Sequence, residues 1–165
     1  MGRGVVVRDL AEGDLVAWRG LWDCYNAFYG RSGTGALPED VVVTTWRRLH
    51  DAAVPVHGLA AEAEAERVPG AGHVPGGALV GIAHYLFHHS TNGIGPACYL
   101  QDLFTAEDAR GRGVGRALVD EVAVRARAAG ASRFYWQTHE TNATARRLYD
   151  RIAERSGFIV YRYPL

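Results

Sequence analysis

The sequence contains no lysine, so all 18 of its basic residues are arginine. Without lysine the chain cannot form the Schiff base that anchors pyridoxal phosphate, and it cannot complete the phosphate loop G-x-x-x-x-G-K-[ST]. It also lacks the G-x-S-x-G elbow that carries the nucleophile of many serine hydrolases. These absences exclude several large classes of enzyme.

Cysteine, long apolar runs and net charge are scarce as well. Cys24 and Cys98 lie far apart and no secretory leader precedes them, which predicts buried, reduced thiols in a cytoplasmic protein. No run reaches the ~18 apolar residues of a membrane span. The 18 acidic residues balance the basic ones, which argues against a nucleic-acid binder. We therefore expect a soluble protein without a membrane or nucleic-acid partner.

The length of 165 residues predicts a single domain, 1–165, that buries its own core. The stretch "ERVPGAGHVPGG" is rich in proline and glycine and predicts a hairpin loop. Hydrophobic spacing and turn signals predict the elements on either side of it. The expected strands are 4–9, 56–63, 78–88, 97–105, 133–138 and 157–163, and the expected helices are 14–29, 38–50, 114–129 and 142–154.

The stretch "RGRGVG" at 110–115 runs directly into a predicted helix. Three glycines exceed the need of one turn, and the free N–H groups of a helix's first turn bind anions. The pattern predicts a phosphate cradle, and the alternative is a glycine-rich turn with a solvated arginine face. The dinucleotide motif G-x-G-x-x-G fails because arginine stands at its third glycine. The candidate residues are Arg110, Gly111, Arg112, Gly113, Val114, Gly115 and Arg116.

A second pattern, "N-x-x-A-x-x-L-Y", lies in the last predicted helix. Asn142 and Tyr149 are seven residues apart, so they lie two turns apart on one helical face. Asn142 stands at the helix start, as an N-cap does. Taken alone, a tyrosine such as Tyr149 is more often a core residue than an acid. The two patterns therefore have to be considered together.

Together with the strand "YLQDLFT" before them, the two patterns resemble the GNAT superfamily of acetyl-CoA-dependent N-acetyltransferases. The elements follow the family's order over the C-terminal two thirds of the chain. The segments "YLQDLF" and "GALVGIAHYLF" are most similar to the branch with the diamine and the histone-like or D-amino-acid acetyltransferases. The resemblance implies an α/β (α+β) fold: a mixed, mostly antiparallel central sheet with splayed middle strands and about four flanking helices.

The resemblance also implies how acetyl-CoA is held as co-substrate. In this family the pantetheine arm adds like a short strand between the splayed strands, which implies backbone contacts from Leu103, Phe104 and Thr105. The diphosphate falls on the cradle, and Asn142 hydrogen-bonds the arm. Tyr149 is by resemblance the acid that protonates the departing thiolate. No metal is expected, because no metal-binding motif accompanies the histidines of "HYLFHH".

The sequence leaves open which group takes the proton of the amine. In the diamine branch a glutamate precedes the aspartate on this strand, whereas here Gln101 precedes Asp102. Glutamine does not accept a proton at neutral pH, so the candidates are a water chain, Asp102, Glu140 and His139. Strand alternation predicts that Asp102 and Gln101 point to opposite faces.

The segment "YNAFYGRSGTG" is expected to line the acceptor site, together with Gln101. Tyr25, Phe28 and Tyr29 either contact the acceptor, by stacking or by binding a cation, or close the core over the sheet edge. Arg31 suits an acceptor that carries a carboxylate, such as a free amino acid, better than a polyamine. The expected acceptor is a small-molecule amine or a peptide.

Two functions stay open on the sequence. One is an N-acetyltransferase, and the other is a non-catalytic acyl-CoA-binding or sensor module on the same fold, which Gln101 keeps in play. The chain has room for one strand after the last helix, which predicts an open sheet edge and a homodimer that covers it.

Overall fold

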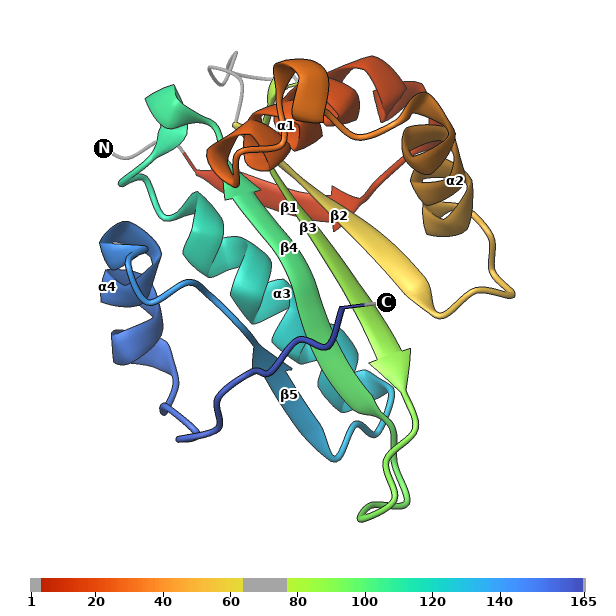
Figure 1. Cartoon of the computed structure of the whole chain (residues 1–165), viewed down its shortest axis with the longest axis vertical. Helices are drawn as coiled ribbons and strands as arrows, with labels where there is room; N and C mark the ends of the chain where they lie inside the picture. Colours follow the sequence, from red (N-terminus) through yellow and green to blue (C-terminus); the bar gives the residue numbers. More distant parts are fainter. Residues whose placement is uncertain (1–3, 64–76, 165) are drawn as a thin grey trace, which may run out of the picture.

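The computed structural model describes residues 4–63 and 77–164, which form a mixed sheet with helices on both faces (Figure 1). This confirms the predicted fold class. The loop predicted at 66–77 lies, apart from its last residue, outside the described residues. The strands are β1 (Val5–Asp9), β2 (Val56–Ala63), β3 (Leu79–His88), β4 (Ala97–Thr105) and β5 (Arg133–Trp136). The α-helices are α1 (Leu15–Phe28), α2 (Glu39–Leu49), α3 (Val114–Ala128) and α4 (Ala143–Ile152).

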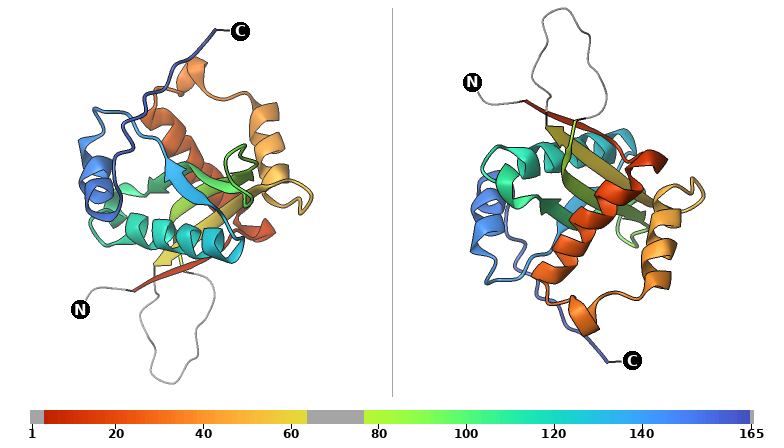
Figure 2. Two further views of the ribbon diagram at one scale, coloured as in Figure 1. Left: turned by 90° about the horizontal axis from the view of Figure 1, so that it is seen from below. Right: turned by 90° about the horizontal axis from the view of Figure 1, so that it is seen from above.

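The strands lie in the order β1-β2-β3-β4-β5. Neighbours from β1 to β4 are antiparallel, and β4 and β5 run parallel, so the sheet is mostly antiparallel as predicted. Helices α1 and α2 cover one face and α3 covers the other (Figure 2). The start of α3 meets α4, because the Leu148 side chain reaches Gly115 there. Two cores result, one on each face of the sheet.

Helical spacing explains both cores. On one face, Leu118 and Val122, one turn apart in α3, are fully buried against the sheet. On the other face, Trp18 and Trp22, one turn apart in α1, are buried with their ring centroids 5.0 Å apart. The polar atoms of this second core need partners, because unpaired polar groups are costly to bury.

Strand β4 carries a bulge at Gln101. His84 pairs with Asp102, and the next residue, Tyr85, pairs with Leu100, so Gln101 has no partner in β3. A bulge of this kind shifts the alternation of side chains by one residue. Leu100 accordingly packs in the core under α3, whereas Asp102 lies on the α1 side and bonds to His84. The bulge thus places a carboxylate on the α1 face, where plain alternation from Leu100 would put it under α3.

Two expectations are wrong. Residues 157–163 form no strand with any part of the chain that the structure describes, and the side chains of Phe158 and Tyr163 are 91% and 89% exposed. Apolar alternation makes a strand only where a neighbour supplies hydrogen bonds, and β5 is four residues long. Cys98 is buried as expected, but Cys24 is exposed, because it lies on the outer face of α1.

Candidate active site

Strands β4 and β5 separate half-way along β4. Their pairing runs from Ala97 with Arg133 to Leu100 with Trp136 and stops there, while β4 continues to Thr105. The other edge of this free half is paired with β3. The predicted splay of the middle strands is therefore present. It leaves backbone groups of Leu103 and Thr105 open toward a ligand in the gap, as predicted. The prediction is wrong for Phe104, whose backbone faces β3: Ala106, two residues on, bonds to the Val80 carbonyl there, and backbone groups alternate between the two edges of a strand.

The glycine-rich loop presents bare N–H groups at the end of this gap. Arg110 donates its N–H to the turn before it, and the next bonded N–H in the loop is that of Ala117. Within the described chain, no N–H from Gly111 to Arg116 has an acceptor. Gly111 and Gly113 have φ of +76° and +85°, the left-handed region that glycine enters without strain. The backbone thus forms the concave donor set that a diphosphate needs.

Contacts around Gly115 tie the loop to two other elements. A Cβ at Gly115 would lie 3.5 Å from the Leu148 side chain of α4 and 3.6 Å from Oγ1 of Thr105 on β4. The cradle, the open half of β4 and the tyrosine-bearing helix therefore meet at one place. Arg110 and Arg112 are exposed beside it, while Arg116 donates from Nε to Asp120 at 2.6 Å.

Helix α4 brings Tyr149 to the gap. Asn142 caps the helix as predicted, with its side chain accepting from the Ala145 N–H at 3.2 Å. The Tyr149 ring packs 5.2 Å from the ring of Trp136, the residue at which β5 leaves β4. Burial raises the pKa of Tyr149 to about 12, and the nearby Tyr29 adds to this. The phenol therefore stays protonated throughout the physiological range.

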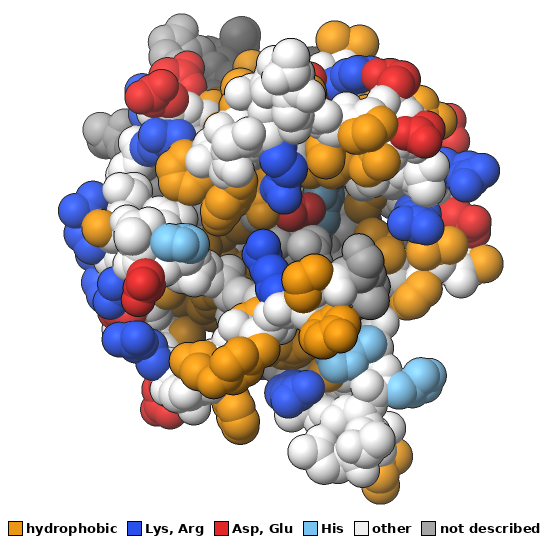
Figure 3. Space-filling model, viewed as in Figure 1, with side chains coloured by type: hydrophobic (Ala, Val, Ile, Leu, Met, Phe, Trp, Pro, Cys, Tyr) orange, Lys and Arg blue, Asp and Glu red, His pale blue; other side chains and the backbone are white. Residues whose placement is uncertain are grey.

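Three aromatic residues lie at the end of α1, and one of them, Tyr29, is near enough to Tyr149 to act on its pKa. The Tyr25 and Tyr29 rings lie 5.1 Å apart, and the Phe28 ring lies 5.1 Å from Tyr29. The Arg31 guanidinium lies 5.8 Å from the centre of the Tyr29 ring. Figure 3 shows a hollow on this face, with acidic and basic side chains set among hydrophobic ones. Gln101 is exposed at the bulge.

A buried hydrogen-bond chain ends at Asp102. The Trp18 indole donates from Nε1 to Nε2 of His84 at 2.8 Å, and Nδ1 of the same ring lies 2.9 Å from Oδ2 of Asp102. The Tyr25 phenol also bonds to Asp102; burial first, and then this carboxylate, raise the pKa of the phenol. The Asp102 side chain is 13% exposed, so part of it reaches solvent.

Asp102 therefore differs from the other candidates for the proton acceptor. His139 bonds at 2.7 Å to the Thr141 hydroxyl, and Glu140 is exposed in the same loop before α4. Among the described residues, neither makes a hydrogen bond, ion pair or ring contact with the aromatic residues at the end of α1, whereas Asp102 bonds to Tyr25. The sequence interpretation missed His84, because one histidine in an apolar strand has no local pattern to mark it.

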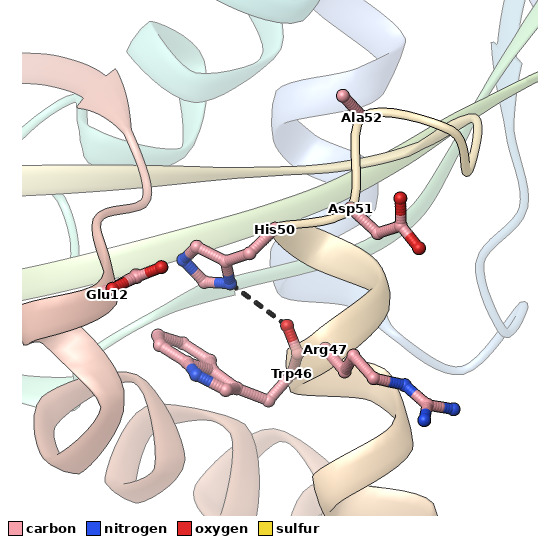
Figure 4. A pocket seen from close by; sticks show the side chains of 6 residues that line it. All are labelled: Glu12, Trp46, Arg47, His50, Asp51 and Ala52. Atoms are coloured by element: carbon pink, nitrogen blue, oxygen red, sulfur yellow. Dashed lines mark hydrogen bonds between the residues drawn. The ribbon is translucent and has the colours of Figure 1, made fainter.

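A second hollow lies elsewhere, between α2 and the turn before α1 (Figure 4). It has a volume of about 640 Å³ and includes His50, whose Nδ1 donates to the Trp46 carbonyl at 3.0 Å. Its lining shares no residue with the glycine-rich loop or with α4. Its residues are Glu12, Trp46, Arg47, His50, Asp51 and Ala52.

Among residues 4–63 and 77–164, no three His, Cys, Asp or Glu side chains come together as a cation would need. The histidines of "HYLFHH" point to different partners, since His84 bonds to Asp102 and His88 lies 3.0 Å from the Tyr135 hydroxyl. No helix in the described part of the chain is long and apolar enough to cross a membrane.

Comparison with known families identifies this arrangement. The model of the Acetyltransferase (GNAT) family matches residues 18–153. The chain belongs to the GNAT family. This match covers both motifs, the splayed strands and the tyrosine-bearing helix, so the resemblance seen in the sequence is confirmed.

Curated GNAT relatives act on amines, as their names state. The D-amino-acid N-acetyltransferase HPA3 of Saccharomyces cerevisiae is 32% identical over 159 residues, which cover 96% of this chain and 89% of that protein. The thialysine N-epsilon-acetyltransferase of Mus musculus is 31% identical over 104 residues, 60% of this chain and 61% of that protein. Both fall in the branch that the sequence resembles.

Solved structures share the GNAT fold. The aminoglycoside N-acetyltransferase AAC(6')-Iy, in complex with CoA, has a TM-score of 0.76 at 18% identity, covering 99% of this chain and 97% of its own. The ribosomal-protein-alanine N-acetyltransferase of Brucella melitensis biovar Abortus 2308 has a TM-score of 0.74 at 22% identity, covering 98% and 100%. At these identities the likeness concerns the fold alone.

Proposed function

We propose that this GNAT protein transfers the acetyl group of acetyl-CoA to the amine of a small molecule, and that the molecule is a free amino acid. The observation that carries the proposal is the meeting of three parts at Gly115: the bare N–H loop, the open half of β4 and the helix of Tyr149. Acetyl-CoA supplies the activated acetyl group when bound, and the residues of the chain hold it and move protons.

The glycine-rich loop suits the diphosphate of CoA. Its free N–H groups from Gly111 to Arg116 lie at the start of α3, where the helix dipole favours negative charge. The exposed Arg110 and Arg112 add positive charge beside the loop. Backbone groups of Leu103 and Thr105 pair with the pantetheine arm in the gap, and Asn142, at the start of α4, hydrogen-bonds to that arm.

Tyr149 is the proposed general acid. Attack of a neutral amine on the thioester forms the C–N bond, and cleavage of the C–S bond leaves a thiolate that needs a proton. Tyr149 holds its proton because burial raises its pKa to about 12. The same poor solvation disfavours a free thiolate, so donation by the phenol accompanies its departure. Asp102 takes the amine proton and releases it to solvent, and solvent returns a proton to Tyr149, so both groups are restored for the next turnover.

A free amino acid suits the acceptor side because its ammonium and carboxylate groups match the opposite charges of Asp102 and Arg31. Asp102 and the rings of Tyr25 and Tyr29 attract an ammonium group. Arg31, near Tyr29, can bind a carboxylate. Phe28 and Gln101, both exposed, line the same side. The match to the Saccharomyces cerevisiae relative covers 89% of that protein, which is named for D-amino acids. This supports an amino acid as the acceptor.

The proposed assembly is a homodimer. The outer edge of β5 has no strand partner among the described residues, and the nearby apolar side chains of 158–163 are largely exposed. A second copy covers both features, since unpaired edges and exposed apolar segments favour association. Light scattering at micromolar concentration should give twice the chain mass, and a monomer mass would contradict this assembly.

The test is thiol release from acetyl-CoA with D- and L-amino acids, spermidine, an aminoglycoside and a histone-like peptide. Turnover is expected on amino acids. The variant Arg31→Gln should raise KM for an amino acid and leave KM for its carboxamide unchanged. Preference for spermidine would contradict the amino-acid proposal. Silence with every acceptor, while acetyl-CoA still raises the Tm, would favour the non-catalytic binding module.

A further inference from the structure

We infer that His84 and Trp18 are positioning residues for the proposed transfer: they hold the Asp102 carboxylate in one orientation, fully charged, where the acceptor's amine loses its proton. The inference deepens the proposed function and rests on it. Its evidence is the buried chain from Trp18 through His84 to Asp102, which joins helix α1 to strands β3 and β4.

The Trp18 indole fixes the tautomer of His84. An indole nitrogen only donates hydrogen bonds, so Nε2 of His84, 2.8 Å away, accepts and carries no proton. The proton of the neutral ring is therefore on Nδ1, which donates to Oδ2 of Asp102 at 2.9 Å. Trp18 is fully buried and His84 is 3% exposed, so water does not compete for either bond.

The same bond keeps His84 neutral. A second proton on the ring has to sit on Nε2, where it would face the Trp18 N–H and break the bond between them. A neutral His84 donates to Asp102 without neutralising it, whereas a cationic His84 would form an ion pair that lowers the basicity of the carboxylate. The arrangement therefore gives a directed carboxylate with its full negative charge.

The remaining groups around Asp102 leave this charge available. Tyr25 donates to Asp102 from α1, and Tyr99 lies near enough to Asp102 to interact electrostatically with it, whereas Tyr29 interacts with these two phenols. Arg31 is the cation that acts on Tyr25. The phenols are neutral at working pH, so the charges that face the acceptor are those of Asp102 and Arg31.

The proton step balances with the groups named. As the amine nitrogen forms its bond to the acetyl carbon, its N–H proton passes to Oδ1 of Asp102, either directly or through one water, and Asp102 then releases it to solvent. Oδ2 keeps its bond from His84, and a carboxylate has about four acceptor positions, so the bond from Tyr25 leaves room for the acceptor. No proton enters or leaves His84 in this step, which separates its role from that of a catalytic base.

Three variants test the inference. His84→Asn keeps an N–H donor at the position of Nδ1, and His84→Leu removes it at similar volume. Trp18→Phe frees Nε2 and lets His84 take a second proton. His57→Leu is the matched control, because His57 stacks on Tyr85 in the core on the opposite face. Melting curves and CoA titration accompany each variant, so that loss of fold is recognised.

For His84→Leu we expect kcat to fall about 10- to 100-fold, the value of one hydrogen bond to a charged group, with CoA affinity unchanged. His84→Asn should recover most of this loss, and His57→Leu should lose none. Trp18→Phe should add an acid limb to the rate profile, because Nε2 of His84 can then take a second proton. Wild-type kcat in His84→Leu would overturn the inference.

A nitrogen NMR spectrum of the histidine rings gives a readout that does not depend on turnover. It should show His84 as the neutral Nδ1–H tautomer, with Nε2 unprotonated, as the bond from Trp18 requires. A doubly protonated His84 in the wild type would overturn the inference even if the enzyme is active. An inactive wild type with every acceptor would instead overturn the proposed function, whatever the tautomer.

Discussion

The substitution Gly81→Ala should displace the glycine-rich loop at 110–116 by pushing the start of α3 away from the sheet. Gly81 of β3 pairs with Thr105 of β4 and lies under the first turn of α3. A Cβ placed there would lie 2.7 Å from Cγ1 of Val114, 3.0 Å from the Phe104 carbonyl oxygen and 3.1 Å from Cδ1 of Leu118. Contacts of this kind are normally ~3.5–4.0 Å, so something has to move.

The start of α3 is the part that gives way. Val114 has one strongly preferred rotamer in a helix, so its methyl group cannot swing aside. The Phe104 carbonyl belongs to the sheet and is held there. Overpacking of this type lowers the free energy of unfolding by about 1 to 3 kcal/mol. Alanine makes the unfolded chain less flexible than glycine does, which offsets ~0.4–1 kcal/mol of this loss. We expect a net loss of about 1 to 2 kcal/mol, which lowers the Tm by about 2 to 8 °C.

The assay combines urea unfolding with calorimetric titration of CoA. Because α3 begins at Val114, lifting it displaces the N–H groups of the loop, and CoA affinity should fall at least tenfold. Gly58→Ala is the matched control: its Cβ would meet Leu10 at 3.1 Å, far from the cradle, so it should lower stability and leave CoA affinity unchanged. A destabilised Gly81→Ala protein that binds CoA like the wild type would refute the reasoning.

Two further predictions follow from pKa shifts. Tyr149 ionises at about 12 in the folded protein and near ~10 when unfolded, so its stabilising effect is complete below pH ~10 and is lost as pH rises through 12. The wild type should therefore lose about 2 kcal/mol more than Tyr149→Phe between pH 10 and 12 in urea unfolding, and equal losses would contradict the burial. Burial raises the pKa of the Cys98 thiol to about 11, so iodoacetamide at pH 8 should label Cys24 alone, and rapid labelling of both would contradict it.

The sequence predicted those parts of the fold that local pattern determines. The bounds of β2 and β4 agree with the structure to the residue, since each is an apolar run between turn signals. The two motifs also lie where expected, at the start of α3 and along α4. These features depend on residues close together in the chain.

Features that depend on distant partners could not be predicted in the same way. The strand expected at 157–163 has the composition of a strand but no neighbour among the described residues. His84 gains its role from Trp18, 66 residues away, and from Asp102, 18 residues away. The bulge at Gln101 brings His84 and Asp102 together, and a shift of one residue in register leaves no mark in hydrophobic spacing.

The central claim is that the loop at 111–116 holds acetyl-CoA while Tyr149 protonates the thiolate. The most direct test measures kcat and CoA affinity of Tyr149→Phe beside the wild type. We predict a fall in kcat of about 10²- to 10⁴-fold, the usual contribution of a general acid, with the CoA dissociation constant unchanged. Wild-type turnover in Tyr149→Phe would contradict the account.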